Sequence, residues 1–440
     1  MIDQGPTPPS GRSQTSLGVI FLVLFADLIG FSIIFPLYAE MLAHYLRNDA
    51  GLLAWAMSWV DHAYPGASFA QRAALFGGIL GAAYATLQFL CAPAWGRLSD
   101  RIGRRPVLLF SIAGTALANV IWVFSGEFTM LLLSRLLAGV MTGNVSVANA
   151  AVADITTPQT RARGMGLIGM AFGLGFILGP AIGGLAYHYL PRVDDAATGW
   201  LTPFSTCAAI AAALSMVNLV WAFARFRETL PPERRVTTPA PGRTANPIQL
   251  FNPALGIGVP MINLAFTLHT LLFAGMEATL VFLSAEKCGY GPAANGALFA
   301  AMGFLSAMMQ GGVFRRLSPR VGERPLAAAG FIILVPGFLL IGLVDWYPHP
   351  WLLWTGVIVL ACGTGLVFPA LNTMASLAGD PQRQGWVLGT FRSAGSLGRA
   401  AGPLLGALIY FMWRPAAPYL VGAIGMLLPL IIIMRVRLMR

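Results

Sequence analysis

Residues 96–106 read GRLSDRIGRRP, and this short charged stretch separates two long apolar runs. It holds four arginines and one aspartate, whereas residues 73–96 before it and residues 106–126 after it carry no charged side chain. Uncharged apolar runs of about 20 residues are long enough to cross the roughly 30 Å hydrocarbon core of a bilayer as helices. The stretch therefore indicates a charged turn between two membrane-spanning helices.

Composition extends this interpretation to the whole chain of 440 residues, which is 57% hydrophobic and only 10% charged. A soluble globular protein carries about 25% charged residues. The apolar runs are too long and unbroken for barrel strands, and the first is too long for a cleaved signal peptide. We predict an all-α polytopic membrane protein with twelve spans, near 17–39, 74–95, 106–125, 129–152, 163–189, 203–224, 256–284, 294–314, 326–345, 351–376, 385–412 and 416–435. Between the first two spans, WAMSWVDHAYPG (55–66) predicts a short amphipathic helix.

The net charge of +11 is distributed unevenly over the predicted loops. Twenty of the 28 lysines and arginines fall in segments on the side of the N-terminus, and five fall on the other side. This bias follows the positive-inside rule, so both termini are expected in the cytoplasm. The basic charge is thus explained by topology, and we expect no nucleic-acid partner.

The reactive side chains form no catalytic or metal-binding pattern. The four cysteines are scattered without metal-ligand spacing, and the single lysine, Lys287, is followed by Cys288, which excludes a GK[ST] phosphate loop. No compact Ser/His/Asp motif is present either. We therefore expect no catalytic residues, no metal and no cofactor, and the chain is not predicted to be an enzyme.

The charged stretch occurs twice. RRLSPRVGERP (315–325) repeats GRLSDRIGRRP at an offset of 219, and GPLLGALIY (402–410) repeats GPAIGGLAY (179–187) at an offset of 223. Two repeated six-helix halves are typical of secondary transporters. We place the halves at 1–224 and 250–440, joined by a polar linker rich in proline and arginine at 225–249, which is expected to be solvated in the cytoplasm.

At this point the chain resembles a known family. The opening stretch resembles the cytoplasmic signature loop of the major facilitator superfamily, residues 131–144 its helix-four arginine motif, and residues 173–184 its helix-five antiporter motif. Residues 25–38 and 153–166 are most similar to the tetracycline-resistance branch of the twelve-helix drug:proton antiporters. The resemblance implies the major facilitator fold, with twelve helices in two pseudo-symmetric halves.

The resemblance also gives the signature loop a role as a cytoplasmic gate. Asp100, its lone acid, is expected to latch the loop to the helix that starts near Gln384. The second copy has Pro319 and Glu323 where the first has Asp100 and Arg104, so the two gates should differ in energy. The alternative is a topological anchor only, and for Asp154 a plain helix-end role. The predicted gate residues are Gly96, Asp100, Arg101, Gly103, Arg104, Arg105 and Asp154.

The fifth span carries a spaced glycine motif. Gly175, Gly179 and Gly183 recur every four residues, with Pro180 and Gly184 beside them. Small residues at this spacing let helix backbones approach closely, and a proline inside a helix favours a bend. We expect a moving interface against the other half, which the resemblance links to exchange. Glycine-rich packing without such a role is the alternative.

Charges inside spans carry the mechanistic prediction, because each costs at least about 2.5–3.5 kcal/mol on insertion scales. Asp27, Arg135 and Glu277 are predicted to couple transport to protons, with Asp27 as the carrier and Glu277 as the alternative carrier. The resemblance implies that the first, fourth, seventh and tenth helices line the central cavity. The alternative is a set of structural ion pairs, with Glu277 and Arg399 as one pair.

Drug-sized ligands usually need apolar and aromatic walls with a few polar groups. Packing against lipid or between helices is the alternative for each such side chain. The residues predicted to line the substrate cavity are Phe31, Phe35, Tyr38, Asn144, Met276, Gln310, Phe368, Asn372, Arg392 and Arg399.

Together these features predict a proton-coupled antiporter that exports a small amphipathic, drug-like molecule by alternating access. The alternative is a uniporter or symporter of a polar or anionic metabolite that uses Arg135, Arg392 and Arg399, and a third is a membrane receptor that moves nothing. Tetracycline is disfavoured, since residues 110–124 hold no carboxylate. The expected partners are a small-molecule substrate, protons and the lipid bilayer. We expect a monomer in a bacterial inner membrane.

Overall fold

The structure is a computed structural model, and it is almost entirely helical. It describes residues 17–48, 51–142, 144–156, 158–191, 193, 199–235, 252, 258–379 and 384–436. The side chains of Asn144 and Gln384 lie outside the described part of the chain.

Consecutive helices run back and forth along one direction. The first half of the chain forms α1 (Leu17–Ser32), η1 (Phe35–Leu37), α2 (Tyr38–Asn48), α3 (Leu52–Ala63), α4 (Phe69–Ile102), α5 (Arg104–Val123), α6 (Phe128–Met141), α7 (Asn144–Ile155), α8 (Pro158–Tyr189), α9 (Ser205–Arg225) and η3 (Pro232–Arg234). The second half forms α10 (Val259–Cys288), α11 (Pro292–Met308), the π-helical η6 (Met309–Phe314), α12 (Arg315–Val321), α13 (Glu323–Leu343), α14 (Pro350–Ala378), α15 (Gln384–Met412), α16 (Ala417–Gly425) and α17 (Leu427–Arg435).

The helices match the predicted spans. In the described residues, ten helical stretches are long and apolar enough to cross a membrane. The long helices α8 and α15 occupy the two remaining predicted spans, so every predicted span coincides with one helix or a run of consecutive helices. The all-α architecture is therefore confirmed. The amphipathic helix expected between the first two spans is α3, which buries Leu53 and Met57 and exposes Trp55 and Trp59.

The sequence repeat is also a repeat of local structure. Gly103 ends α4 with φ 109°, and Gly322 ends α12 with φ 86°. A positive φ of this kind is strained for residues with a Cβ, so glycine is required where the chain turns sharply from one helix to the next. The offset between the two glycines is the 219 residues of the sequence repeat.

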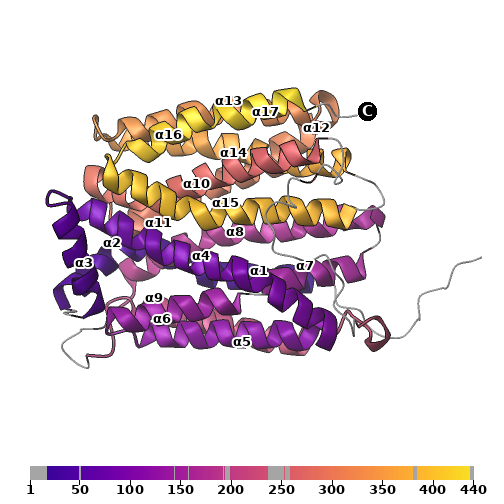
Figure 1. The fold of residues 1–440 in the computed structure, drawn as a ribbon, viewed down its shortest axis with the longest axis horizontal. Coiled ribbons are helices and arrows are strands. Elements are labelled where there is room, and N and C mark those ends of the chain that lie inside the picture. The colour runs from indigo at the N-terminus through magenta and orange to yellow at the C-terminus, as the bar shows by residue number, and fades with distance from the viewer. Residues whose placement is uncertain are drawn as a thin grey trace, which may run out of the picture.

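The two halves lie side by side (Figure 1). The N-terminal helices, indigo to magenta, fill one side of the view, and the C-terminal helices, orange to yellow, fill the other. The halves join mainly where α8 packs against α11 and α4 packs against α15, and α4 also packs against α10. The end at which α4 meets α5 is the predicted cytoplasmic end, and the end that carries α3 is the predicted outer end.

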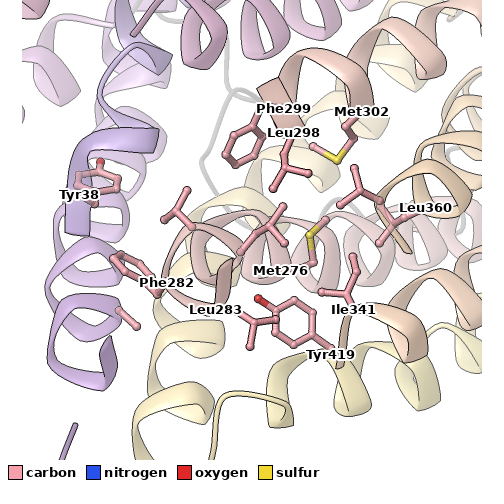
Figure 2. Packing of buried hydrophobic residues seen from close by; sticks show 14 of the residues in the cluster. Tyr38, Met276, Phe282, Leu283, Leu298, Phe299, Met302, Ile341, Leu360 and Tyr419 are labelled. Atoms are coloured by element: carbon pink, nitrogen blue, oxygen red, sulfur yellow. The ribbon is translucent and has the colours of Figure 1, made fainter. Parts of the chain in front are cut away.

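The C-terminal half has a closely packed apolar core. Figure 2 shows Met276 and Leu283 of α10 directed toward Ile341 of α13 and Tyr419 of α16. Phe282 points the other way, toward the N-terminal ribbon that carries Tyr38. Helix α10 thus has one face in its own core and another at the boundary between the halves.

Candidate functional site

A cavity of about 90 Å³ lies between the two halves. Its N-terminal wall comes from α1, η1, α2, α4 and α8, and its C-terminal wall comes from α10 and α15. This differs from the expected set of helices, since neither the fourth span (α6 and α7) nor the tenth (α14) contributes a lining residue. The lining residues are Leu28, Phe31, Phe35, Tyr38, Gly77, Gly81, Tyr84, Gln88, Phe176, Ala274, Glu277, Ala278, Val281, Arg399 and Pro403.

Aromatic rings form the N-terminal wall of the cavity. The ring of Phe31 stacks on Tyr84 with centroids 4.1 Å apart and meets Phe35 edge-on at 5.2 Å. Phe176 of α8 contacts both phenylalanines, at 5.7 and 5.8 Å. The sequence predicted Phe31, Phe35 and Tyr38 but missed Tyr84 and Phe176, because an aromatic residue in an apolar span carries no sign of the direction in which it points.

Two charged side chains lie in the cavity wall, both predicted as intramembrane charges. The guanidinium of Arg399 lies 3.7 Å from the carboxylate of Glu277 and 4.5 Å from the ring centroid of Phe176. The Arg399 side chain is 37% exposed, whereas that of Glu277 is 12% exposed. The cavity therefore presents a cation to any ligand inside it, and an aromatic face supports that cation.

Asp27 and Arg135 are buried in the N-terminal half and are not lining residues. Arg135 donates hydrogen bonds to Asn119 Oδ1 (3.2 Å) and Ser134 Oγ (2.9 Å) and lies 4.7 Å from the ring of Trp122. Asp27 and Arg135 are therefore both enclosed within the N-terminal half and do not form part of the cavity wall.

The other predicted cavity residues lie elsewhere. Met276 is 1% exposed in the C-terminal core (Figure 2), and Gln310 lies on η6. The guanidinium of Arg392 lies 5.4 Å from the ring of Phe368, which is partly buried on α14 together with Asn372. None of these five is a lining residue, and the prediction for Asn144 falls on a side chain outside the described residues.

The halves contact each other on both sides of the cavity. At the predicted outer end, Gln71 Nε2 of α4 donates a hydrogen bond to the Phe411 carbonyl of α15 (3.1 Å), and the rings of Tyr64 and Phe411 lie 5.1 Å apart. Toward the predicted cytoplasmic end, Leu388 of α15 belongs to the same buried apolar cluster as Leu28 of α1. The halves are therefore held together at both ends of the cavity in this structure.

The helix-five glycines face two different neighbours. A Cβ on Gly175 or Gly179 would collide with α1, where Ser32 Oγ also donates to the Gly175 carbonyl (2.9 Å), and a Cβ on Gly183 would collide with Ile33 just after α1. A Cβ on Gly184 would instead collide with the Pro292 carbonyl of α11 in the other half. The four-residue ridge thus packs within its own half, whereas we expected it to face the other half. The contact between halves is made by Gly184 and by Pro180, whose carbonyl lies against Gly296.

The signature loop forms a charged network at the predicted cytoplasmic end. Arg104 Nη1 donates to Asp100 Oδ1 (2.6 Å) and Ser99 Oγ (2.7 Å), and Arg104 Nε donates to Asp154 Oδ2 (2.9 Å). Arg105 donates to the Phe223 carbonyl of α9 (2.9 Å). Asp154 joins the network as predicted, and these contacts connect parts of the N-terminal half.

The remaining predicted gate residues have smaller roles in this arrangement. Gly96 is buried and its carbonyl accepts a hydrogen bond from Ser99 Oγ (2.8 Å), whereas Arg101 is exposed. The latch between Asp100 and the start of α15 stays a prediction, because the side chain of Gln384 lies outside the described residues.

Sequence reasoning missed Glu228, which follows α9 in the predicted linker. Its carboxylate accepts hydrogen bonds from the backbone N–H groups of Arg104 (2.8 Å) and Arg105 (3.1 Å). A carboxylate at this position caps the first turn of α5 and complements the positive end of the helix. Phe226 and Leu230 on either side are buried, so this part of the linker packs against the N-terminal half and is not solvated. The sequence signal for this contact was an acidic residue, Glu228, with the apolar residues Phe226 and Leu230 on either side of it.

The chain is similar to proteins from animals and bacteria. It is 34% identical to the human Major facilitator superfamily domain-containing protein 10 over 427 residues, which cover 92% of this chain and 89% of the relative. It is 31% identical to the class D tetracycline resistance protein of Salmonella ordonez over 418 residues, which cover 92% of both chains.

Solved structures agree with these relatives. The crystal structure of the human organic anion transporter MFSD10 (TETRAN) superposes with a TM-score of 0.75 at 33% identity, covering 95% of this chain and 98% of that one. A bacterial homolog of the human lysosomal transporter Spinster, in an inward-facing and unoccupied conformation, shares the fold at 16% identity with a TM-score of 0.62, covering 95% and 94%. Residues 20–403 and 316–439 match the Major Facilitator Superfamily. The chain is therefore a membrane transporter and not an enzyme, and it belongs to the Major Facilitator Superfamily.

Proposed function

We propose that this transporter carries a small amphipathic organic anion across the membrane by alternating access. The observation that carries the proposal is the guanidinium of Arg399, which is 37% exposed in the cavity wall against the ring of Phe176. A guanidinium is suited to carboxylates and sulfonates because its N–H groups donate in a fixed planar fork. The rings of Phe31, Phe35 and Tyr84 would receive the apolar body of the same molecule.

The size of the cavity supports a conformational cycle. Sites for drug-sized ligands enclose roughly 300–1,000 Å³. The space between the halves is about 90 Å³, so it must widen before such a ligand fits. Separation of α8 from α11, or of α4 from α15, would widen it from one end, which is the motion that alternating access requires.

Two hypotheses from the sequence are thereby combined. The amphipathic substrate of the leading hypothesis fits the aromatic wall, and the anionic charge of the alternative fits Arg399. Of the three arginines named in that alternative, only Arg399 lines the cavity. The human relative described as an organic anion transporter supports the same charge. The tetracycline resistance proteins, at 28–31% identity, support a drug-like size.

The proposed orientation of the chain in the membrane rests on the charge bias of the sequence. We propose cytoplasmic termini because the arginines gather on the side of the signature loop. Coupling to protons, function as a monomer and a bacterial inner membrane stay predictions.

The test uses the full chain reconstituted into liposomes, with naphthalenesulfonate as the anionic probe. Arg399→Gln should reduce probe uptake by about tenfold or more, because a hydrogen bond to a charged group contributes about 1.5–3 kcal/mol. The matched control is Arg47→Gln on α2, outside the cavity, which should transport like the wild type. Normal uptake by Arg399→Gln would overturn the proposal, and so would a preference for tetraphenylphosphonium, an amphipathic cation, over the anion.

A further inference from the structure

We infer that the carboxylate of Glu277 occupies the position beside Arg399 to which the anionic group of the substrate binds. An organic anion therefore binds only together with a proton on Glu277. The inference rests on the proposed function and adds the direction of coupling. The anion and the proton would cross the membrane in the same direction, whereas the sequence led us to expect exchange.

The first argument is the geometry of the pair. Arg399 Nη1 and Glu277 Oε2 are 3.7 Å apart, whereas the ion pairs of Arg72 with Asp61 and of Arg104 with Asp154 close to 2.9 Å. At 3.7 Å the Arg399–Glu277 pair is too long for a direct hydrogen bond, so an anion that binds Arg399 breaks none between them. Arg399 is also the more exposed partner, at 37% against 12%, so its guanidinium is the more accessible of the two groups to an anion in the widened cavity.

The second argument is that both partners belong to one half. Glu277 lies on α10 and Arg399 on α15, and these helices pack closely through Gly275, Gly402 and Gly406, where an added Cβ would meet backbone atoms of the other helix at 3.0 Å or less. Movement of one half against the other therefore leaves the pair intact. Only chemistry within the cavity can separate the two groups, either a proton on Glu277 or a competing anion on Arg399.

The third argument is the charge of the cavity. Among the lining residues, only Glu277 and Arg399 carry formal charge, so the wall is neutral while Glu277 is ionised. An anion bound alone would leave one uncompensated negative charge in an apolar site, which is costly. An anion bound with a proton on Glu277 keeps the site neutral, since Arg399 simply changes its partner.

No other group facing Glu277 replaces it as the proton acceptor. From the N-terminal wall, Tyr38 and Tyr84 contribute phenol hydroxyls, which in model peptides ionise near pH 10. Tyr84 is further held by Thr142 Oγ1 at 2.8 Å, and Gln88 does not titrate. On α10 itself, His269 is within electrostatic range of Arg399 but is not a lining residue, and its ring contacts Thr364 of α14 and the ring of Phe331.

The consequence for pH has a definite sign. An ionised Glu277 competes with the anion for Arg399, and a protonated one does not. Anion binding therefore tightens as pH falls, by up to about tenfold per pH unit. The tightening stops at the pH where Glu277 is already protonated in the protein without ligand. By the same linkage, each bound anion takes up about one proton at higher pH.

The experiment is isothermal titration calorimetry of the purified full chain with naphthalenesulfonate, whose sulfonate stays ionised between about pH 5 and pH 8. Titrations in buffers of different ionisation enthalpy give the number of protons taken up per anion. For the wild type we expect binding that tightens as pH falls, with proton uptake. For Glu277→Gln we expect binding that does not depend on pH, without proton uptake.

Two further variants keep the test decisive. Glu277→Asp retains a carboxyl group and should retain proton uptake, and Glu127→Gln in the exposed turn before α6 should behave like the wild type. Arg399→Gln should lose binding at every pH, and if it does not, the proposed anion site is wrong. If Arg399→Gln loses binding but wild-type binding is independent of pH and takes up no proton, the inference fails and the proposed function stands. Loss of all binding in a folded Glu277→Gln would also overturn the inference.

Discussion

The carboxyl groups of Asp27 and Glu277 lie inside apolar spans, but their surroundings differ. Glu277 lines the cavity opposite Arg399, whereas Asp27 is 3% exposed and is not a lining residue. A group that loads and releases protons during transport needs a path to water, which a cavity provides. At the scale of single residues we therefore propose Glu277 as the group that exchanges protons, whereas the sequence favours Asp27.

Asp27→Asn should then leave the coupling in place. We expect the variant to take up about one proton per bound naphthalenesulfonate, like the wild type. Its thermal midpoint should fall, because a buried polar group that loses its partners costs about 1–3 kcal/mol. Calorimetry and thermal denaturation measure the two effects separately. Loss of proton uptake in Asp27→Asn, together with normal uptake in Glu277→Gln, would return the carrier role to Asp27.

Asp345, in the turn after α13, is a charged residue with a structural role. Burial opposes its ionisation, but hydrogen bonds from Lys287 and Arg414 outweigh burial and hold the pKa of the carboxyl below its usual value. The distances are 3.0 Å to Lys287 Nζ and 2.9 Å to Arg414 Nε. A carboxyl whose pKa is lower in the folded protein stabilises the fold above its unfolded pKa of about 3.9. This contribution is lost as pH falls through the folded pKa.

Asp345→Asn should therefore lower the thermal midpoint by a few degrees near neutral pH, from a loss of about 2 kcal/mol. The difference from the wild type should shrink as pH falls below about 4. The control is Asp61→Asn, which breaks an exposed ion pair with Arg72 worth at most about 1 kcal/mol. A midpoint for Asp345→Asn equal to that of the control at neutral pH would contradict this assignment.

The signals that single residues carry explain what could be predicted of the site. A charge in an apolar span is conspicuous, so Glu277 and Arg399 were found from the sequence. Phe176 and Gln88 were missed because their types are ordinary in a membrane helix and only the fold sets the direction in which they point. The residue type of Met276 suits a cavity wall, but its face of α10 packs into the core.

At the scale of elements, the positions of the helices could be predicted from the sequence, but the breaks within them could not. Every predicted span is helical, since long apolar runs determine helix positions directly. The breaks inside spans were not predicted. The first span stops at Ser32 and resumes through η1, where Pro36 lacks the N–H that would continue the helix. The π-helical turn at Met309–Phe314 has no comparable signal in its sequence.

The cap that Glu228 places on α5 gives a prediction at this scale. Glu228→Ala would leave the N–H groups of Arg104 and Arg105 without their carboxylate acceptor. Loss of a helix N-cap costs about 0.5–2 kcal/mol, so the thermal midpoint should fall. Glu233→Ala, an exposed acid in the same segment, is the matched control and should have no effect. Equal midpoints for the two variants would show that the cap contributes nothing to stability.

For the whole molecule, the repeat in the sequence relates the contact of α8 with α11 to the contact of α15 with α4. The offset of 223 places Gly184 of α8 and Ala407 of α15 at equivalent positions. Gly184 packs against α11, and Ala407 packs against Gly78 of α4. The glycines on the other faces of α8 and α15 pack against α1 and α10, again in equivalent pairs. The sequence contains this repeated pattern of small residues. Only the structure shows which face of α8 and α15 packs within its own half and which face packs against the other half.

This separation predicts opposite outcomes for two glycines on one helix. Gly184→Leu should force α8 away from Pro292 of α11 and open the predicted outer end, because the leucine side chain meets the other half. Gly179→Leu should instead lower the thermal midpoint, since it collides with Ser32 within its own half. A Cβ on Gly173 of the same helix would meet nothing within 4 Å, so Gly173→Leu should change neither the outer end nor the thermal midpoint.

The distance between spin labels at the outer end measures the opening. Trp55→Cys on α3 and Trp413→Cys after α15 place labels at two exposed positions, one in each half, in a chain whose four native cysteines are replaced by serine. Gly184→Leu should lengthen this distance and slow transport, because closure of the outer end is one step of the cycle. If Gly184→Leu keeps both the wild-type distance and the wild-type rate, the close approach of α8 to α11 is not needed for closure.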